Sequence, residues 1–215
     1  MRGLAAWGRI AVRWWYAFCQ MVCWIFLVPV FRVRVFGREN IPASGGALIV
    51  SNHQSFFDPV LIGVGLRREV DYMARASLFR NVLFRRLITS LNAFPIKREG
   101  VDVTAMRESI ARIQHGRLVL VFPEGTRTRD GSLGPVRRGL SLISERARAT
   151  IVPAVIQGAY QAWPRGAKMI RPHRIGVAFG RPITVEEQSR MTSEELAAVV
   201  ADRWKALRSS LAIYV

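Results

Sequence analysis

The sequence predicts an α/β fold in which a sheet is covered by helices, preceded by an apolar N-terminal segment. Short apolar runs typical of buried strands alternate with longer segments in which apolar residues recur every three or four positions, as in amphipathic helices. Several strand-like runs end at polar and charged clusters, where ligands bind in such folds. The 215 residues suffice for one domain with a moderate core. We expect residues 1–31 to form the N-terminal segment and residues 32–215 the domain.

The N-terminal segment has the composition of a membrane anchor. Residues 14–31 are aromatic and aliphatic, interrupted by Gln20. As a helix this run would be about 27 Å long, just short of a hydrocarbon thickness of about 30 Å. Three arginines flank it on each side, so the positive-inside rule gives no orientation, and this balance favours anchoring in one leaflet. A cleaved signal peptide is disfavoured because the run continues directly into the alternating pattern of residues 32–35. Cys19 and Cys23 are interpreted as small apolar residues of this run.

Strand-like runs follow along the rest of the chain, each short and rich in β-branched or aromatic residues. Pro153 lies within the sixth run. A proline has no backbone N–H to give to a ladder, so we expect this run to be an edge strand or to contain a bulge. The seven runs are residues 32–36, 47–51, 70–74, 94–96, 118–122, 151–156 and 175–179.

Helical patterns lie between and after these runs. Asp102 is an N-cap candidate for a helix that ends before Gly116. Residues 192–195 have the pattern of a capping box and begin a C-terminal helix. The expected buried faces are Val103, Met106, Ile110 and Ile113 in the first helix, and Leu196, Val200, Trp204, Leu207 and Leu211 in the second.

Residues 78–91 have a broad apolar side next to Arg80, Arg85 and Arg86. One interpretation is a core helix. The other is a second membrane-contacting element, whose arginines meet lipid phosphates while its apolar side enters the leaflet or lines an acyl-chain groove. The sequence leaves both interpretations open.

His53 and Asp58 follow the apolar run 47–51 at a spacing that regular structure cannot bring together. Five steps turn a helix by roughly 140° net, and in a strand they place two side chains on opposite faces. Asp58 before Pro59 is typical of a helix start, so the two groups are expected to meet across a strand–loop–helix turn. A histidine held by a carboxylate is a general base near neutral pH. Ser55 is disfavoured as a nucleophile because no Gly-x-Ser-x-Gly turn surrounds it.

Two further clusters follow strand-like runs. Residues 122–127, with the sequence Phe-Pro-Glu-Gly-Thr-Arg, join a glycine, a hydroxyl and a guanidinium, which suits an anion-binding turn. Glu124 is a candidate for orienting one of these donors. Lys97 and Arg98 leave the run 94–96 as adjacent cations. Each cluster alone is as easily an ordinary turn, so their combination matters.

In this order the segments resemble the glycerolipid acyltransferase family, over about residues 47–156. Residues 52–58 match its first block, Asn-His-x4-Asp, and residues 122–127 match its third without a departure. Its second block fits Pro95, Ile96 and Arg98 but has Asn92 where glycine is usual; asparagine tolerates a left-handed backbone. Its fourth block fits Val152 and Pro153.

The resemblance implies direct transfer of an acyl group from a thioester, acyl-CoA or acyl-carrier protein, to the free hydroxyl of 1-acylglycerol 3-phosphate, giving phosphatidate. His53 would be the general base and Asp58 would orient it. The site residues implied for substrate binding are Arg98, Glu124, Gly125, Thr126 and Arg127. It also implies a mixed sheet, no metal and no cofactor besides the acyl donor. Other acceptors stay open: glycerol 3-phosphate, another lysophospholipid or a lyso-aminolipid.

The formal net charge of +17 predicts polyanionic partners. An anionic membrane surface and the phosphates of an acyl donor satisfy this charge. A non-catalytic lipid- or nucleic-acid-binding protein is a weaker alternative, because no nucleic-acid-binding motif is visible. With the apolar segment, these properties predict a protein anchored at the cell membrane with its domain on the cytoplasmic side.

Overall fold

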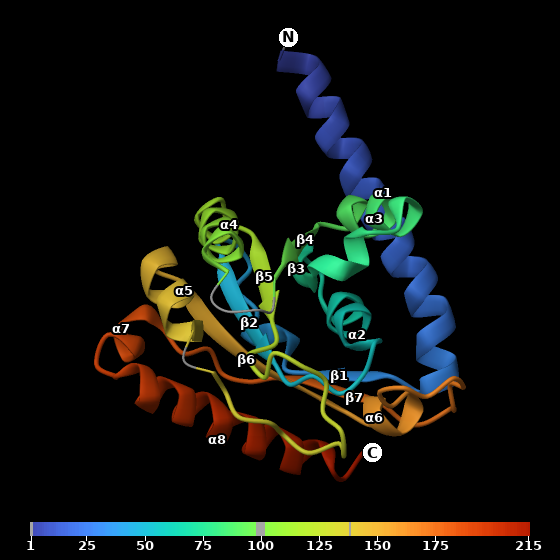
Figure 1. The fold of residues 1–215 in the computed structure, drawn as a ribbon, viewed down its shortest axis with the longest axis vertical. Helices are drawn as coiled ribbons and strands as arrows, with labels where there is room; N and C mark the ends of the chain where they lie inside the picture. Colours follow the sequence, from blue (N-terminus) through green and yellow to red (C-terminus); the bar gives the residue numbers. More distant parts are fainter. Residues whose placement is uncertain (1, 98–101, 138) are drawn as a thin grey trace.

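The chain folds around a mixed sheet, as the computed structural model of residues 2–97, 102–137 and 139–215 shows (Figure 1). These described residues form a seven-stranded sheet in the order β1-β7-β6-β2-β5-β3-β4. Strands β6 and β7 are antiparallel and the other neighbours in it are parallel. All seven expected strands are present: β1 Arg34–Phe36, β2 Ala47–Ser51, β3 Val70–Arg75, β4 Ala93–Ile96, β5 Leu118–Val121, β6 Thr150–Gln157 and β7 Gly176–Phe179.

The helices lie between these strands and at both ends of the chain (Figure 1). The α-helices are α1 Arg2–Phe31, α2 Asp58–Gly65, α3 Val82–Ser90, α4 Val103–Gln114, α5 Gly139–Ala147, α6 Ala159–Ala162, α7 Val185–Gln188 and α8 Ser193–Leu211. Two short 3₁₀ helices are η1 Arg38–Asn40 and η2 Ala76–Phe79.

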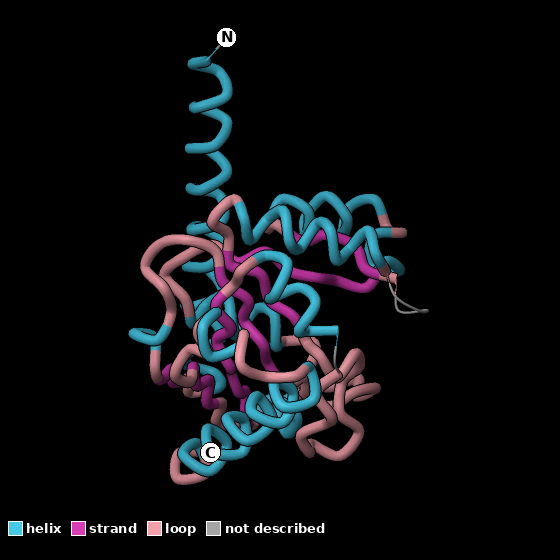
Figure 2. Tube along the Cα trace, turned by 90° about the vertical axis from the view of Figure 1, so that its left-hand side faces the viewer, coloured by secondary structure: helices cyan, strands magenta, loops and turns pink. Residues whose placement is uncertain are grey.

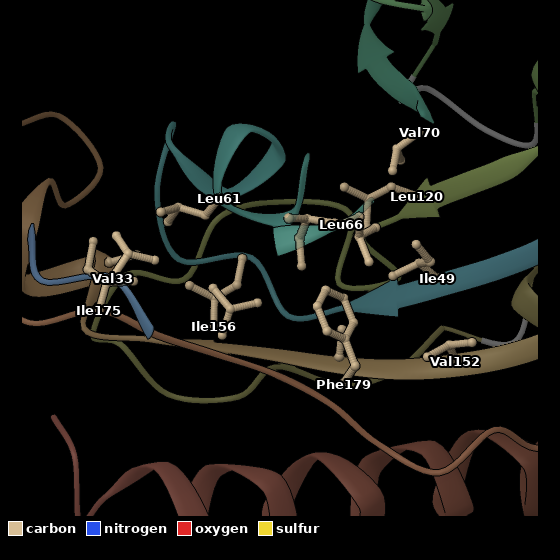
Figure 3. Packing of buried hydrophobic residues seen from close by; sticks show 14 of the residues in the cluster. Val33, Ile49, Leu61, Leu66, Val70, Leu120, Val152, Ile156, Ile175 and Phe179 are labelled. Atoms are coloured by element: carbon tan, nitrogen blue, oxygen red, sulfur yellow. The ribbon is translucent and has the colours of Figure 1, made fainter. Parts of the chain in front are cut away.

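Helices cover both faces of the sheet, because successive strand side chains point to opposite sides. One face packs against α2, α6 and the end of α1, where Ile49 and Leu120 of the central strands are buried (Figure 3). The other face packs against α4, α5 and α8 through Leu48 and Val119. The two cores hold the central strands, and with them the loops that follow β2 and β5, in fixed positions.

The C-terminal helix α8 begins at the predicted capping box. Thr192 accepts a hydrogen bond from the Glu195 backbone N–H, and the Glu195 carboxylate accepts one from the Thr192 backbone N–H. Trp204 is fully buried and its indole Nε1 donates to the backbone oxygen of Val50 at 3.0 Å. Since Val50 lies three residues before His53, α8 supports the end of β2 that leads into the site.

The prediction that the sixth strand lies at an edge is wrong, because β6 lies between β7 and β2. The alternative of a bulge holds only in part, because the extra residue lies on the partner segment and not in β6. The β6 residues Ile151 and Ala154 pair with Ile183 and Phe179, so three steps along β6 face four steps along the partner segment. Pro153 lies inside this irregularity, where its carbonyl accepts from Gly180 N at 2.8 Å and no N–H is required from it.

Helix α4 begins at its predicted N-cap, since Asp102 accepts from the Ala105 backbone N–H at 3.0 Å. The expected burial of Val103 is wrong: this side chain is 52% exposed. It occupies the first helical position, before the helix reaches the sheet. Ile113 is buried as expected, and Met106 and Ile110 pack partly against the same core.

The apolar helix α1 lies along the domain with its second half and projects beyond it with its first half (Figure 2). Its inward stripe includes the buried Tyr16 and also Gln20, whose amide donates to the backbone oxygens of Gly63 at 2.7 Å and Leu66 at 2.6 Å. Gln20 thus satisfies carbonyls at the end of α2. On the outward side, Trp14 is 73% and Phe26 66% exposed. Residues 14–31 are long and apolar enough to cross a membrane.

Helix α3 and η2 occupy residues 76–90, and the core-helix interpretation of this segment is wrong. No side chain of α3 is buried, and Leu83 is 76% exposed. Helix α3 starts at Asn81, whose side chain accepts from Phe84 N at 2.9 Å. It lies beside α1, where Trp15 Nε1 donates to Ser90 Oγ at 3.0 Å. Helices α1 and α3 therefore lie on the same side of the molecule (Figures 1 and 2), and each has exposed apolar side chains.

Candidate active site

The predicted motifs meet where the central parallel strands end. Strand β2 is flanked by β5 and β6, both parallel to it, so their carboxyl ends lie at the same edge of the sheet. The loop after β2 carries His53, and the loop after β5 carries residues 122–127. The backbone joins the two loops directly, because Thr128 N donates to His53 O at 2.8 Å.

Asn52 fixes the position where the first loop leaves the sheet. Its side chain is buried and pairs with the backbone of Ile156 in β6: Nδ2 donates to the carbonyl oxygen at 3.0 Å and Oδ1 accepts from the N–H at 2.8 Å. The amide thus imitates a peptide group and extends the ladder beyond Ser51. The sequence indicated a turn residue here; an asparagine directly after a fully buried strand was the available signal.

His53 and Asp58 lie together, as the spacing predicted. His53 Nδ1 is 2.7 Å from Asp58 Oδ2, and Asp58 is fully buried. The same oxygen accepts from the backbone N–H groups of Gln54 at 2.5 Å and Ser55 at 2.7 Å. Asp58 is the first residue of α2, where the helix dipole also favours a negative charge. These contacts and the start of α2 hold the Asp58 side chain in one orientation beside His53.

The imidazole has a defined orientation. Its ring stacks on Phe122, the first residue after β5, with centroids 4.1 Å apart and an interplanar angle of 16°. Nδ1 is occupied by Asp58, so Nε2 is the nitrogen available to a substrate, and a carboxylate at Nδ1 favours the tautomer with a lone pair on Nε2. The geometry therefore leaves one nitrogen of the imidazole, Nε2, unoccupied by Asp58.

Ser55 has a structural role. Its side chain is buried and Oγ donates to the backbone oxygen of Trp163 at 2.9 Å. The Trp163 ring packs against Phe57 with centroids 4.8 Å apart. Ser55 thus ties the His53 loop to the segment after α6, and its hydroxyl proton points away from the imidazole.

Glu124 is buried behind the histidine. Its Oε1 accepts from Gly134 N at 3.2 Å. Burial raises the pKa of Glu124 to about 7, and the charge of Asp58 adds to this, while backbone hydrogen bonds from Gly134 and His53 oppose it. A Cβ atom at Gly134 would lie 3.1 Å from the Glu124 side chain, so a larger residue there would push this side chain by a few tenths of an ångström. Glu124 holds the 134 loop against the His53 loop.

Gly125, Thr126 and Arg127 form the turn next to His53. Gly125 has a φ of +73°, a backbone conformation that favours glycine, and a Cβ atom there would lie 2.9 Å from the Arg137 guanidinium, which would have to shift. Thr126 Oγ1 accepts from Arg165 Nη1 at 3.3 Å. Partial burial lowers the pKa of Arg127, as does the nearby charge of Arg165. Guanidinium groups therefore gather around one exposed turn.

Arg98 lies outside the described residues, so its predicted place beside this turn stays a prediction. Asn92, which replaces the usual glycine of that block, has a φ of +66°, as its tolerance of the left-handed region predicted. Its backbone oxygen also accepts from Tyr72 N at 3.2 Å, so the following strand β4 starts in register.

A cavity of about 570 Å³ opens at His53 and Arg127 and continues between α1, α2 and α3. Its wall is mostly apolar, and its polar members include His53, Arg75, Ser77 and Arg127. The paired hydroxyls of Tyr16 and Tyr72, 2.7 Å apart, form a polar point in this wall. Apolar residues that line the cavity include Phe18, Val22, Val60, Leu78, Phe84 and Ile88. A groove at residues 78–91 was one of the sequence-based interpretations, whereas the contribution of α1 to this cavity was not predicted.

A mixed α/β sheet with these blocks at one edge defines an O-acyltransferase. The family model described as Acyltransferase matches residues 32–157, more than half of the chain. The chain belongs to this acyltransferase family, which confirms the resemblance that its motifs indicated.

Known proteins similar to this chain agree with the family assignment. The 1-acyl-sn-glycerol-3-phosphate acyltransferase of Bacillus subtilis (strain 168) is 29% identical over 188 residues, 87% of this chain and 92% of that protein. The chloroplastic 1-acyl-sn-glycerol-3-phosphate acyltransferase LPAT1 of Arabidopsis thaliana is 28% identical over 163 residues, 74% of this chain and 46% of that protein. The crystal structure of the 1-acyl-sn-glycerophosphate (LPA) acyltransferase PlsC from Thermotoga maritima superposes with a TM-score of 0.77 at 26% identity, covering 91% of this chain and 80% of that one.

Proposed function

We propose that the protein transfers an acyl group from acyl-CoA or acyl-carrier protein to the free hydroxyl of 1-acylglycerol 3-phosphate and releases phosphatidate. The observation that supports this most is the His53–Asp58 pair at the junction of a guanidinium-rich turn and an apolar cavity. A substrate with an anionic headgroup and a long apolar chain fits this site, with the headgroup at the guanidinium-rich turn and the chain in the apolar cavity. The names of the relatives above support the same acceptor.

His53 is the general base of this reaction. Nε2 takes the hydroxyl proton as the alcohol oxygen attacks the thioester carbonyl, so that a C–O bond forms and the C–S bond breaks. The imidazolium then returns the proton to the departing thiolate. Asp58 stabilises the imidazolium through Nδ1. A thioester is an activated donor, so no covalent acyl-enzyme is needed, and the buried Ser55 hydroxyl is engaged by Trp163.

The headgroup is held by the turn after β5. Arg127 offers a planar fork to the phosphate, and Gly125 and Thr126 let the backbone approach it. Arg98 is proposed to complete the site from the segment after β4. Glu124 supports this turn from behind as a neutral or charged group near pH 7.

We further propose that residues 1–31 anchor residues 32–215 at the cell membrane, with the domain on the cytoplasmic side. The outward side chains of α1 and the exposed Leu83 of α3 support contact with the hydrocarbon. The anchored protein should sediment with membranes and resist a high-salt wash. Full release by salt alone would contradict the anchor.

The test is an acylation assay with purified membranes or detergent-solubilised protein. Each donor is assayed against lysophosphatidate, glycerol 3-phosphate, a zwitterionic lysophospholipid and a lyso-aminolipid. We expect transfer to lysophosphatidate to dominate and His53→Ala to lose roughly 100-fold to 10,000-fold in rate, the usual contribution of a general base. His115→Ala is the matched control, because His115 is exposed and bonded to Ala111 O. If another acceptor is preferred, that acceptor replaces lysophosphatidate as the proposed substrate. Native activity of a folded His53→Ala variant would refute the role of His53 as general base.

A further inference from the structure

Arginines from outside the sequence motif converge on the turn after β5. The guanidinium of Arg137 packs over Gly125, and that of Arg165 donates to Thr126 Oγ1 at 3.3 Å. With Arg127, three cations surround one turn. None of the three forms an ion pair with a carboxylate within residues 2–97, 102–137 and 139–215. An arginine cluster without acidic partners is suited to bind an anion.

Arg165 is held in a fixed relation to the catalytic loop. Its neighbour Trp163 accepts through its backbone oxygen from Ser55 Oγ and packs against Phe56 and Phe57 of the same loop, with ring centroids 5.5 Å and 4.8 Å away. The Trp163 indole also donates to Ala167 O at 3.0 Å and closes residues 163–167 into a compact loop. Arg165 therefore reaches the turn from a second loop that moves with His53.

Arg127 and Arg165 repel each other in this arrangement, and the pKa of Arg127 is lowered in part by Arg165. A bound anion with two negative charges relieves this repulsion more than a single charge or a zwitterion does. The cluster thus favours a terminal phosphomonoester over a phosphodiester headgroup or a neutral one.

We infer that Arg165 is a further substrate-binding residue, which grips the phosphomonoester of the acceptor together with Arg127 and selects it against acceptors that lack a terminal phosphate. The inference rests on the function proposed above and extends it to a residue outside the four sequence blocks. The acyl donor also carries phosphates, so the experiment must separate the two sources.

The experiment compares Arg165→Ala and Arg165→Lys with the matched control Lys168→Ala. Lys168 is an exposed cation a few residues along the chain. For each variant, KM is measured separately for lysophosphatidate and for the acyl thioester, together with the rate toward monoacylglycerol, which has no phosphate. Lysophosphatidate binding is also titrated in a His53→Ala background without acyl donor, so that no turnover occurs.

For Arg165→Ala we expect KM and Kd for lysophosphatidate to rise roughly ten-fold, the lower range for a hydrogen-bonded charged pair at an exposed site. The KM of the donor, the rate with monoacylglycerol and the melting temperature should stay at wild-type values. Arg165→Lys should recover part of the affinity, since it keeps the charge and loses the fork.

Three results would overturn the inference: an unchanged KM for lysophosphatidate in Arg165→Ala, a rise confined to the donor KM, or an equal rise in Lys168→Ala. A wild-type protein that does not acylate lysophosphatidate would instead refute the proposed function, and the binding titration would still report on Arg165.

Discussion

Asp58→Asn should reduce turnover by about three orders of magnitude with little effect on substrate KM. In the wild type, Asp58 Oδ2 lies 2.7 Å from His53 Nδ1 and is fully buried. Charge centres about 4 Å apart attract by about 4 kcal/mol at an effective dielectric constant near 20, and this stabilisation of the imidazolium is lost in the amide. By transition-state theory, about 4 kcal/mol corresponds to about 1,000-fold in rate.

The asparagine amide of Asp58→Asn should affect the stability of the fold less than the rate of turnover. Its oxygen can still accept from the backbone N–H groups of Gln54 and Ser55, while its NH₂ group would face Nδ1 and favour the unproductive tautomer. The assay is the initial rate of phosphatidate formation at saturating lysophosphatidate and thioester. Asp202→Asn is the matched control, since Asp202 is exposed and pairs with Lys205. A loss below ten-fold in a folded Asp58→Asn protein would refute this account.

Three further predictions concern stability and membrane binding. The pKa of Glu124 is raised to about 7 in the folded state, because burial favours the neutral carboxyl group. The stability that this neutral group contributes is fully present below the unfolded pKa near 4.5 and is lost as pH rises through about 7. In the wild type, the free energy of unfolding should therefore fall by up to about 3 kcal/mol between pH 4.5 and 7. Glu124→Gln should remove this fall, as measured by urea titration at several pH values. Trp204→Phe should cost about 1–3 kcal/mol in urea unfolding, because the Val50 carbonyl loses its buried donor; an unchanged midpoint would contradict this. Leu83→Glu should weaken binding to anionic vesicles without lowering the melting temperature, whereas Val103→Glu, at another exposed apolar position, should bind like the wild type; equal binding of both variants would exclude α3 from the membrane contact.

The sequence was sufficient for those parts of the site that depend on local order along the chain. His53 and Asp58 flank a strand–loop–helix turn, so their meeting follows from one short segment. The turn at residues 122–127 likewise carries its glycine, hydroxyl and guanidinium in consecutive positions. The strands could be predicted because each is a short, nearly continuous apolar run.

The remaining parts depend on which distant segments the fold brings together. Arg137 reaches the turn at Gly125 from the far end of the same connection and Arg165 from another loop, and no spacing rule connects them to it. Because a proline cannot donate, Pro153 predicted either an edge strand or a bulge. The strand is interior, and the extra residue on the neighbouring segment removes the need for a donor there. Val103 fits the apolar period of α4 but lies at its first position, where the helix has not yet reached the sheet.

The contact between Gln20 and the end of α2 links the proposed membrane anchor to the His53–Asp58 pair. Helix α2 is eight residues long, or about 12 Å, and runs from Asp58 at one end to the carbonyls held by Gln20 at the other. Helix α2 thus connects the proposed membrane helix α1 to the Asp58 carboxylate, which orients the imidazole. If α1 rests in lipid as proposed, its depth of immersion sets the height at which the alcohol is deprotonated, so the acceptor can react while its acyl tail stays in the bilayer.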